Sequence, residues 1–192
     1  MKKDFNSSHL FASSGIFMIV AFGASLLSGY PKEVGDIGMK PVLIGACWGG
    51  GLFILMMFIG RYLQRYVPSY RDLVTELCEL FSNLSWPTII LISVMAGISE
   101  ELLFRGVIQS YLVGVTSPLF GVIISACLFG VMHFYNRLYI VLTLIVGLFI
   151  GWLYYTTQSL LLVVVLHSVY DILAFACIVK YPHLLGLDES TN

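Results

Sequence analysis

Six ionisable side chains interrupt stretches of the sequence that are otherwise apolar. They fall in three segments of its second half: Glu100, Glu101, Arg105, His133, His167 and Asp171. A charged group at the centre of a bilayer costs about 2.5–3.5 kcal/mol on insertion scales. A buried carboxylate beside an imidazole can take a proton from water, and a second histidine with a nearby carboxyl group can polarise a carbonyl oxygen. Hydrolysis of a peptide bond inside a membrane requires these parts.

Helical spacing sorts the residues into pairs. Glu101 and Arg105 are four residues apart, so they share one helix face and can form an internal ion pair. Glu100 is rotated by about 100° from Glu101, because a helix has 3.6 residues per turn. Its partner must therefore come from another helix. His167 and Asp171 also share one face, at the same four-residue spacing.

Each pair also has a purely structural interpretation. An intramembrane pair such as Glu101 and Arg105 is more often structural than catalytic, and His133 alone would more often be a hydrogen-bonded packing residue. His167 with Asp171 could simply bridge two helices. Packing is nevertheless a costly explanation for all of these residues together, since each carries its own desolvation penalty.

The composition indicates which solvent surrounds these residues. Of 192 residues, 58% are hydrophobic and 11% are charged, against about 45–50% and about 25% in soluble domains. Lipid must therefore cover much of the chain. The net charge of -1 gives no reason to expect nucleic acid as a partner. The four cysteines are far apart without a C-x-x-C pair, so we interpret them as buried thiols and not as zinc ligands or disulfides.

Six apolar stretches are long enough to predict membrane-spanning helices. They lie near residues 10–29, 41–60, 87–113, 118–135, 138–156 and 159–180. Between the second and third, the segment Tyr70–Leu84 has apolar residues at three- and four-residue steps, which predicts an amphipathic helix at the membrane interface. The expected fold class is all-α, a polytopic membrane helical bundle of about six transmembrane helices plus one interfacial amphipathic helix.

The predicted organisation has three parts. Residues 1–84 hold the N-terminal transmembrane helices and the interfacial helix, residues 85–182 form a catalytic helical core, and residues 183–192 form a polar tail. The first apolar run could be a secretory signal peptide, but it is nearly long enough to span a bilayer and no Ala-x-Ala site follows, so we expect a retained helix.

Basic residues predict the orientation of the helices. With the N-terminus in the cytoplasm, seven of the ten lie on the cytoplasmic side: Lys2, Lys3, Arg61, Arg65, Arg71, Arg137 and Lys180. This arrangement agrees with the positive-inside rule. One difficulty is that His133 lies only three residues before Asn136, nearer the predicted cytoplasmic surface than Glu100. Either the fourth helix extends past Asn136 or the bundle is tilted.

Three motifs occur in order on the late helices. They are Glu100-Glu101-Leu102-Leu103-Phe104-Arg105, Phe129-Gly130-Val131-Met132-His133 and His167-Ser168-Val169-Tyr170-Asp171. Read as Glu-Glu-x-x-x-Arg, Phe-x-x-x-His and His-x-x-x-Asp/Asn, they resemble the CAAX prenyl protease and bacteriocin-processing (Abi) family of intramembrane proteases. The likeness covers roughly residues 85–180 and leaves the first two helices unassigned.

The resemblance implies a helical fold with a conical cavity open to the cytoplasm, in a protein of the bacterial inner membrane. It also implies roles by position: Glu100 with His133 activates water, His167 with Asp171 stabilises the oxyanion, and Glu101 with Arg105 supports the site. Asp171 is a variant of the Asn position that the family tolerates. An ionised Asp is a poor oxyanion donor, so Asp171 must be protonated or must orient His167.

The sequence leaves two mechanisms open. Glu100, His133 and His167 could supply three ligands to zinc with a fourth position for water, although the His-Glu-x-x-His pattern of soluble zinc proteases is absent. Direct catalysis by the glutamate explains the same residues without a metal.

The predicted function is an intramembrane endopeptidase that cleaves a membrane-associated peptide or protein tail. The alternative is a non-catalytic membrane scaffold or immunity-type protein that binds a peptide or partner. A proton-coupled transporter would also use intramembrane Glu and His, but the few helices and the lack of an inverted repeat argue against it. The sequence identifies neither the substrate, nor its prenylation, nor an oligomeric state.

Overall fold

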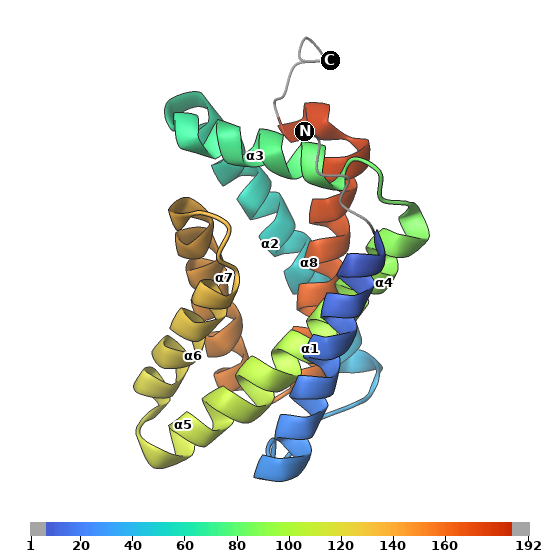
Figure 1. Cartoon of the computed structure of the whole chain (residues 1–192). Helices are drawn as coiled ribbons and strands as arrows, with labels where there is room; N and C mark the ends of the chain where they lie inside the picture. The colour runs from blue at the N-terminus through green and yellow to red at the C-terminus, as the bar shows by residue number, and fades with distance from the viewer. Residues whose placement is uncertain (1–6, 186–192) are drawn as a thin grey trace.

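Helices account for the secondary structure of residues 7–185, the part of the chain that the computed structural model describes, with side chains from residue 10 on (Figure 1). The elements are α1 Ser7–Ser28, α2 Met39–Tyr66, α3 Pro68–Phe81, α4 Trp86–Glu101, the π-helix η1 Leu102–Gln109, α5 Ser110–Val115, α6 Pro118–Met132, α7 Arg137–Thr157, α8 Leu160–Lys180 and the 3₁₀ turn Pro182–Leu185. The predicted all-α helical bundle is confirmed.

Five helices are long and apolar enough to cross a membrane within the described range. They are α1, α2, the continuous helix formed by α4, η1 and α5, α7 and α8. The predicted fourth span is only partly correct, because α6 has 15 residues and ends at Met132 instead of continuing to residue 135.

Side-chain caps begin the late helices. Ser85, Ser117, Asn136 and Ser159 each accept a hydrogen bond from the backbone N–H three residues further on. Such caps satisfy a donor that the first turn of a helix leaves unpaired. The loops between α5 and α8 are short, and α6 and α7 pack against each other as an antiparallel pair (Figure 1).

The amphipathic helix predicted at residues 70–84 is confirmed as α3. It lies across one end of the bundle, the end where α1 begins and α8 ends (Figure 1). Its apolar face is buried through Leu73 and Val74. Arg71, Asp72, Glu76 and Glu79 are exposed on the other face.

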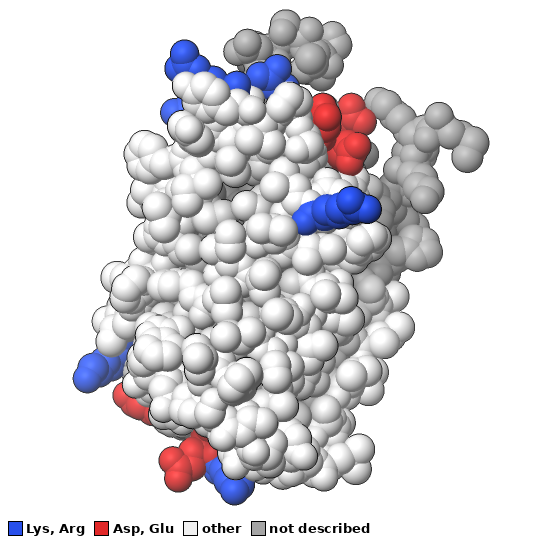
Figure 2. All heavy atoms as spheres, turned by 90° about the vertical axis from the view of Figure 1, so that its left-hand side faces the viewer, with Lys and Arg blue, Asp and Glu red and all other residues white. Residues whose placement is uncertain are grey.

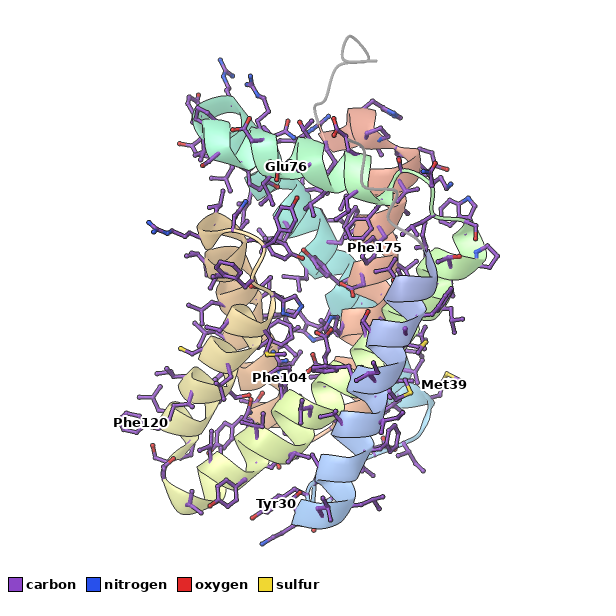
Figure 3. All side chains as sticks on the ribbon, viewed as in Figure 1. Tyr30, Met39, Glu76, Phe104, Phe120 and Phe175 are labelled. Carbon is purple, nitrogen blue, oxygen red and sulfur yellow. The ribbon has the colours of Figure 1, made fainter. Side chains whose placement is uncertain are left out.

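On the face drawn in Figure 2, the surface of the molecule is uncharged in its middle and charged toward its ends, as expected for a protein that crosses a bilayer. Figure 2 shows charged side chains gathered toward the two ends of the face in view, with a broad band of uncharged residues between them. In Figure 3, Phe104 lies inside the bundle and Phe120 extends outward from α6. Phe104 is 2% exposed and Phe120 is 60% exposed. The expectation that all four cysteines are buried is wrong, because Cys47 and Cys127 lie on this outer apolar surface.

Glycines on α2 bring that helix against α8. A Cβ atom at Gly45 or Gly49 would lie 2.5 Å from the backbone oxygen of Leu162 or Leu166 respectively. Small residues let two membrane helices approach this closely. The contact holds the N-terminal helices on the part of α8 that carries His167.

Gly49→Ala is therefore expected to lower the free energy of unfolding by about 1–3 kcal/mol, because overpacking forces two backbones apart. The matched control is Gly50→Ala, where an added Cβ meets no atom within 4 Å. Thermal unfolding of both variants in detergent measures the difference. Equal stability of the two would show that α2 and α8 do not pack through Gly49.

Candidate active site

A cavity of about 310 Å³ lies between α3 and the centre of the bundle. Its walls come from α2, α7 and α8, and the apolar face of α3 covers one side of it. Most of the lining is apolar, and the polar groups include His133, His167 and Asp171. The cavity therefore joins an apolar space to the ionisable residues predicted from the sequence.

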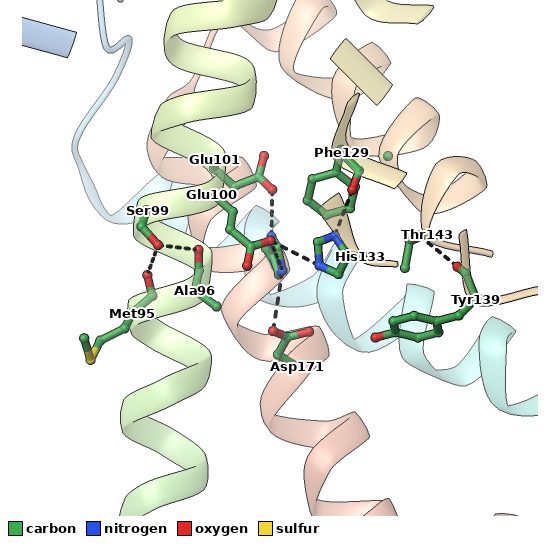
Figure 4. Close-up of polar contacts among 12 residues, drawn as sticks. Met95, Ala96, Ser99, Glu100, Glu101, Phe129, His133, Tyr139, Thr143 and Asp171 are labelled. Carbon is green, nitrogen blue, oxygen red and sulfur yellow. Dashed lines mark hydrogen bonds and ion pairs between the residues drawn. The ribbon is translucent and has the colours of Figure 1, made fainter. Parts of the chain in front are cut away.

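Two histidines from different helices meet the carboxylate of Glu100 (Figure 4). Its Oε2 lies 3.4 Å from Nε2 of His133 and 3.9 Å from Nε2 of His167. Glu100 itself does not line the cavity; it reaches the two rings from α4. The prediction that the partner of Glu100 must come from another helix is confirmed.

The backbone fixes the orientation of the His133 ring. Its Nδ1 lies 2.9 Å from the carbonyl oxygen of Phe129. A carbonyl oxygen only accepts, so Nδ1 carries the hydrogen and Nε2 faces Glu100 with its lone pair when the ring is neutral. His133 is the residue at which α6 ends, and its own N–H bonds the carbonyl of Gly130 instead of that of Phe129. The alternative in which the fourth helix extends past Asn136 is wrong, because α6 ends at Met132, and His133 still lies within 3.4 Å of Glu100.

His167 lies between three carboxyl groups. Its Nδ1 is 2.7 Å from Oε1 of Glu101, and its Nε2 is 3.5 Å from Oδ2 of Asp171 in addition to the contact with Glu100. Acceptors on both sides suit a ring that carries a hydrogen on each nitrogen. The predicted pairing of His167 with Asp171 along one face of α8 is confirmed, and Glu101 is a partner that helical spacing did not predict.

Glu101 and Arg105 form the predicted ion pair, fully inside the protein. Their side chains are 0% and 1% exposed, and Nη1 of Arg105 lies 3.2 Å from Oε1 of Glu101. Nη2 donates to the carbonyl of Gly147 on α7 at 3.1 Å, and the guanidinium lies 4.4 Å from the ring centroid of Phe129. A charge this deeply buried is stable only with such partners. Arg105 thereby connects α4, α6 and α7 behind the site.

The π-helix η1 begins at the residue after Glu101. Side chains from its surroundings satisfy its irregular backbone: Ser110 Oγ donates to the carbonyl of Arg105 at 2.9 Å, and Ser125 Oγ donates to that of Phe104 at 2.8 Å. Gln109 Nε2 ties its far end to the carbonyl of Gly151 at 2.8 Å. Wide turns of this kind often occur at functional sites, and no feature of the local sequence indicates this one.

Three contacts hold α3 over the cavity. The hydroxyl of Tyr135, in the loop between α6 and α7, interacts with the carboxylate of Glu76 on α3. Partial burial together with this contact to a carboxylate raises the pKa of Tyr135. At the start of α3, Arg71 Nη2 donates to the carbonyl of Gln64 at 3.1 Å. Below α3, Phe175 of α8 meets Phe81 edge to face at 5.1 Å (Figure 3).

Within residues 7–185, no group of three or more His, Cys, Asp or Glu side chains is arranged to hold a metal ion. Glu101 and Asp171 instead occupy the ring nitrogens of His167, and Phe129 occupies Nδ1 of His133.

Comparison with known proteins agrees with the motifs. Residues 82–173 match the family model described as type II CAAX prenyl endopeptidase Rce1-like. The chain is also similar to the uncharacterised protein YpbD of Bacillus subtilis (strain 168), with 27% identity over 142 residues, which cover 71% of this chain and 70% of YpbD. No solved structure matches. The helical core that contains the Glu100–Glu101, His133 and His167 motifs is thus similar to the type II CAAX prenyl endopeptidase Rce1-like family.

Proposed function

We propose that this protein is an intramembrane endopeptidase that hydrolyses a peptide bond in a membrane-associated peptide or protein tail. One observation carries the proposal: Oε2 of Glu100 lies 3.4 and 3.9 Å from Nε2 of His133 and His167, beside a largely apolar cavity. Three side chains from three helices thus face one point inside the bundle. The family match over residues 82–173 supports a protease.

In the first step Glu100 acts as the general base. A water molecule next to Glu100 and His133 gives its proton to the carboxylate while its oxygen attacks the scissile carbonyl carbon. The neutral His133 ring orients the water through its Nε2 lone pair, because its Nδ1 hydrogen is donated to Phe129. When the tetrahedral intermediate collapses, protonated Glu100 passes the proton to the leaving amine.

His167 supplies positive charge where the oxyanion forms. Glu101 accepts the Nδ1 hydrogen at 2.7 Å, so the Nε2 hydrogen of the doubly protonated ring points to the side of Glu100 and Asp171, where it can be donated to the carbonyl oxygen of a bound substrate. Asp171, 3.5 Å from Nε2, fixes the ring from the other side. In this role Asp171 orients His167 and does not itself donate, which is one of the two alternatives left open by the sequence.

Chelation is expected to leave turnover unchanged, because a base made of Glu100 and His133 needs no Lewis acid. The measurement is the cleavage rate of the purified protein after dialysis against 1,10-phenanthroline, together with the metal content by mass spectrometry. Loss of activity that returns on addition of Zn²⁺ would instead support the zinc mechanism.

The membrane placement belongs to the same proposal. We place the chain in the bacterial inner membrane with its N-terminus in the cytoplasm and with the cavity open on that side. Support comes from α3, which covers the cavity at the end of the bundle where α1 begins and α8 ends (Figure 1). Arg61, Arg65 and Arg71 belong to the same end, as the positive-inside rule requires.

The test is a comparison of peptides released from membranes of cells that express the wild type or Glu100→Gln. Peptide ends present only with the wild type would identify the cleavage site, and a synthetic peptide spanning that site should be cut by the purified wild type alone. A Glu100→Gln variant that releases the same peptides would contradict the proposal. A variant that cuts nothing but still complements a deletion would support the scaffold alternative.

A further inference from the structure

Tyr139 on α7 faces the site from the side opposite α4. The capping residue Asn136 accepts a hydrogen bond from its backbone N–H at 2.9 Å, which fixes Tyr139 in the first turn of α7. Its side chain lines the cavity together with His133, His167 and Asp171. Figure 4 shows the ring extending from α7 with its hydroxyl toward Asp171 and His133.

The Tyr139 hydroxyl lies in the electrostatic field of the reacting groups. Its ring centroid is 6.3 Å from that of His133, and its side chain lines the same cavity as His167 and Asp171. Its backbone is occupied by Asn136 and Thr143, but its hydroxyl makes no hydrogen bond to another residue of the described chain. It is a donor directed into the cavity and available to a substrate.

Asp171 makes that donor necessary. A tetrahedral oxyanion is stabilised by two or more hydrogen-bond donors. A carboxylate at position 171 only accepts hydrogen bonds, and it already faces Nε2 of His167. His167 is then the one donor that the three motifs provide. A phenol donates readily and stays neutral, so it avoids adding a charge to the membrane interior.

We propose that the Tyr139 hydroxyl is the second hydrogen-bond donor to the oxyanion and replaces the donor that Asp171 lacks as a carboxylate. The inference rests on the proposed peptidase function. As the water oxygen bonds to the carbonyl carbon, the π electron pair moves to the carbonyl oxygen, and the water proton goes to Glu100. Tyr139 and His167 then donate to that oxygen until the C–N bond breaks and the amine takes the proton.

The experiment measures kcat and KM for a synthetic peptide that spans the cleavage site found in cells. Tyr139→Phe is expected to lower kcat about 10- to 100-fold and to change KM less than about threefold, because the lost contact exists only in the transition state. In the Asp171→Asn background the amide supplies a donor, and Tyr139→Phe should then cost less than about threefold. The control is Tyr62→Phe on the outer surface of α2, because Tyr62 is 64% exposed and does not line the cavity.

The outcomes separate the two proposals. An unchanged kcat in Tyr139→Phe, or a rise in KM alone, would overturn the role of Tyr139 while wild-type cleavage still supports the peptidase. Equal losses in both backgrounds would show that Tyr139 does not compensate for Asp171. A wild-type protein that cleaves no peptide contradicts the proposed function, and the role of Tyr139 with it.

Discussion

Glu100→Gln should lower peptide hydrolysis by about 10³-fold or more while the protein remains folded. The amide has the shape of the carboxylate but cannot accept a proton, and a positioned general base contributes about 10²–10⁴-fold. Glu100 contacts the His133 and His167 rings at 3.4 and 3.9 Å, and each ring has a second partner in the bundle. Loss of the Glu100 contacts therefore leaves the bundle intact. The measurement is kcat on the synthetic peptide, with thermal unfolding recorded on the same preparation.

The control for that variant is Glu79→Gln, on the exposed face of α3. It makes the same chemical change outside the site, so its kcat should equal that of the wild type. A Glu100→Gln protein that turns over at the wild-type rate would remove the base from the mechanism. A similar loss in Glu79→Gln would indicate a general effect of charge on substrate binding.

Arg105→Met is expected to have the largest effect on stability. It removes the cation from a carboxylate that is 0% exposed, and breaking one side of a buried ion pair costs about 3–5 kcal/mol. The contact with the Gly147 carbonyl and the stacking on Phe129 disappear with it. Thermal unfolding in detergent, or the yield of folded protein, measures the loss.

A second substitution separates stability from catalysis. Adding Glu101→Gln to Arg105→Met removes the unpaired charge, so folded protein should recover. Turnover should stay low, because the Gln side chain introduced at position 101 can still hydrogen-bond the His167 ring but carries no negative charge. The carboxylate of Glu101 supplies that charge in the wild type, where it favours a ring with both nitrogens protonated. Recovery of activity together with stability would show that Glu101 serves only the ion pair. A single Arg105→Met variant as stable as the wild type would contradict the buried pair.

Helical periodicity predicted the parts of the site that depend on one helix. The four-residue spacing of Glu101 with Arg105, and of His167 with Asp171, gave contacts of 3.2 and 3.5 Å. The rotation of about 100° between successive helix residues also showed that Glu100 needs a partner from another helix. These inferences succeed because a membrane helix is regular and because an ionisable group in lipid must be paired.

Contacts between helices could not be predicted in this way. Glu101 bonds His167 across 66 residues, and spacing along one helix cannot specify which face of another it meets. The end of α6 at Met132 depends on the His133 ring, which takes the Phe129 carbonyl while the backbone tightens to Gly130. Hydropathy predicted a longer helix there, because Phe134 and Tyr135 continue the apolar run.

The π-helix η1 depends on tertiary partners in the same way. Ser125 of α6 accommodates its widened turns from outside the helix, and nothing in the local sequence Leu102–Gln109 requires them. The role of Tyr139 likewise depends on how α7 packs, since the residue belongs to none of the three motifs. The sequence could therefore identify the candidate site residues, and the packing decides how they are held.

The central claim is that Glu100 and His133 act on one water molecule, and a double-mutant cycle in kcat tests it most directly. When two residues act as a unit, the effects of their substitutions on kcat are strongly non-additive. We expect Glu100→Gln with His133→Ala to retain about the same residual rate as Glu100→Gln alone. Losses that multiply, with the double variant slower than either single variant by the full product, would show that the two residues act independently and would contradict the shared site.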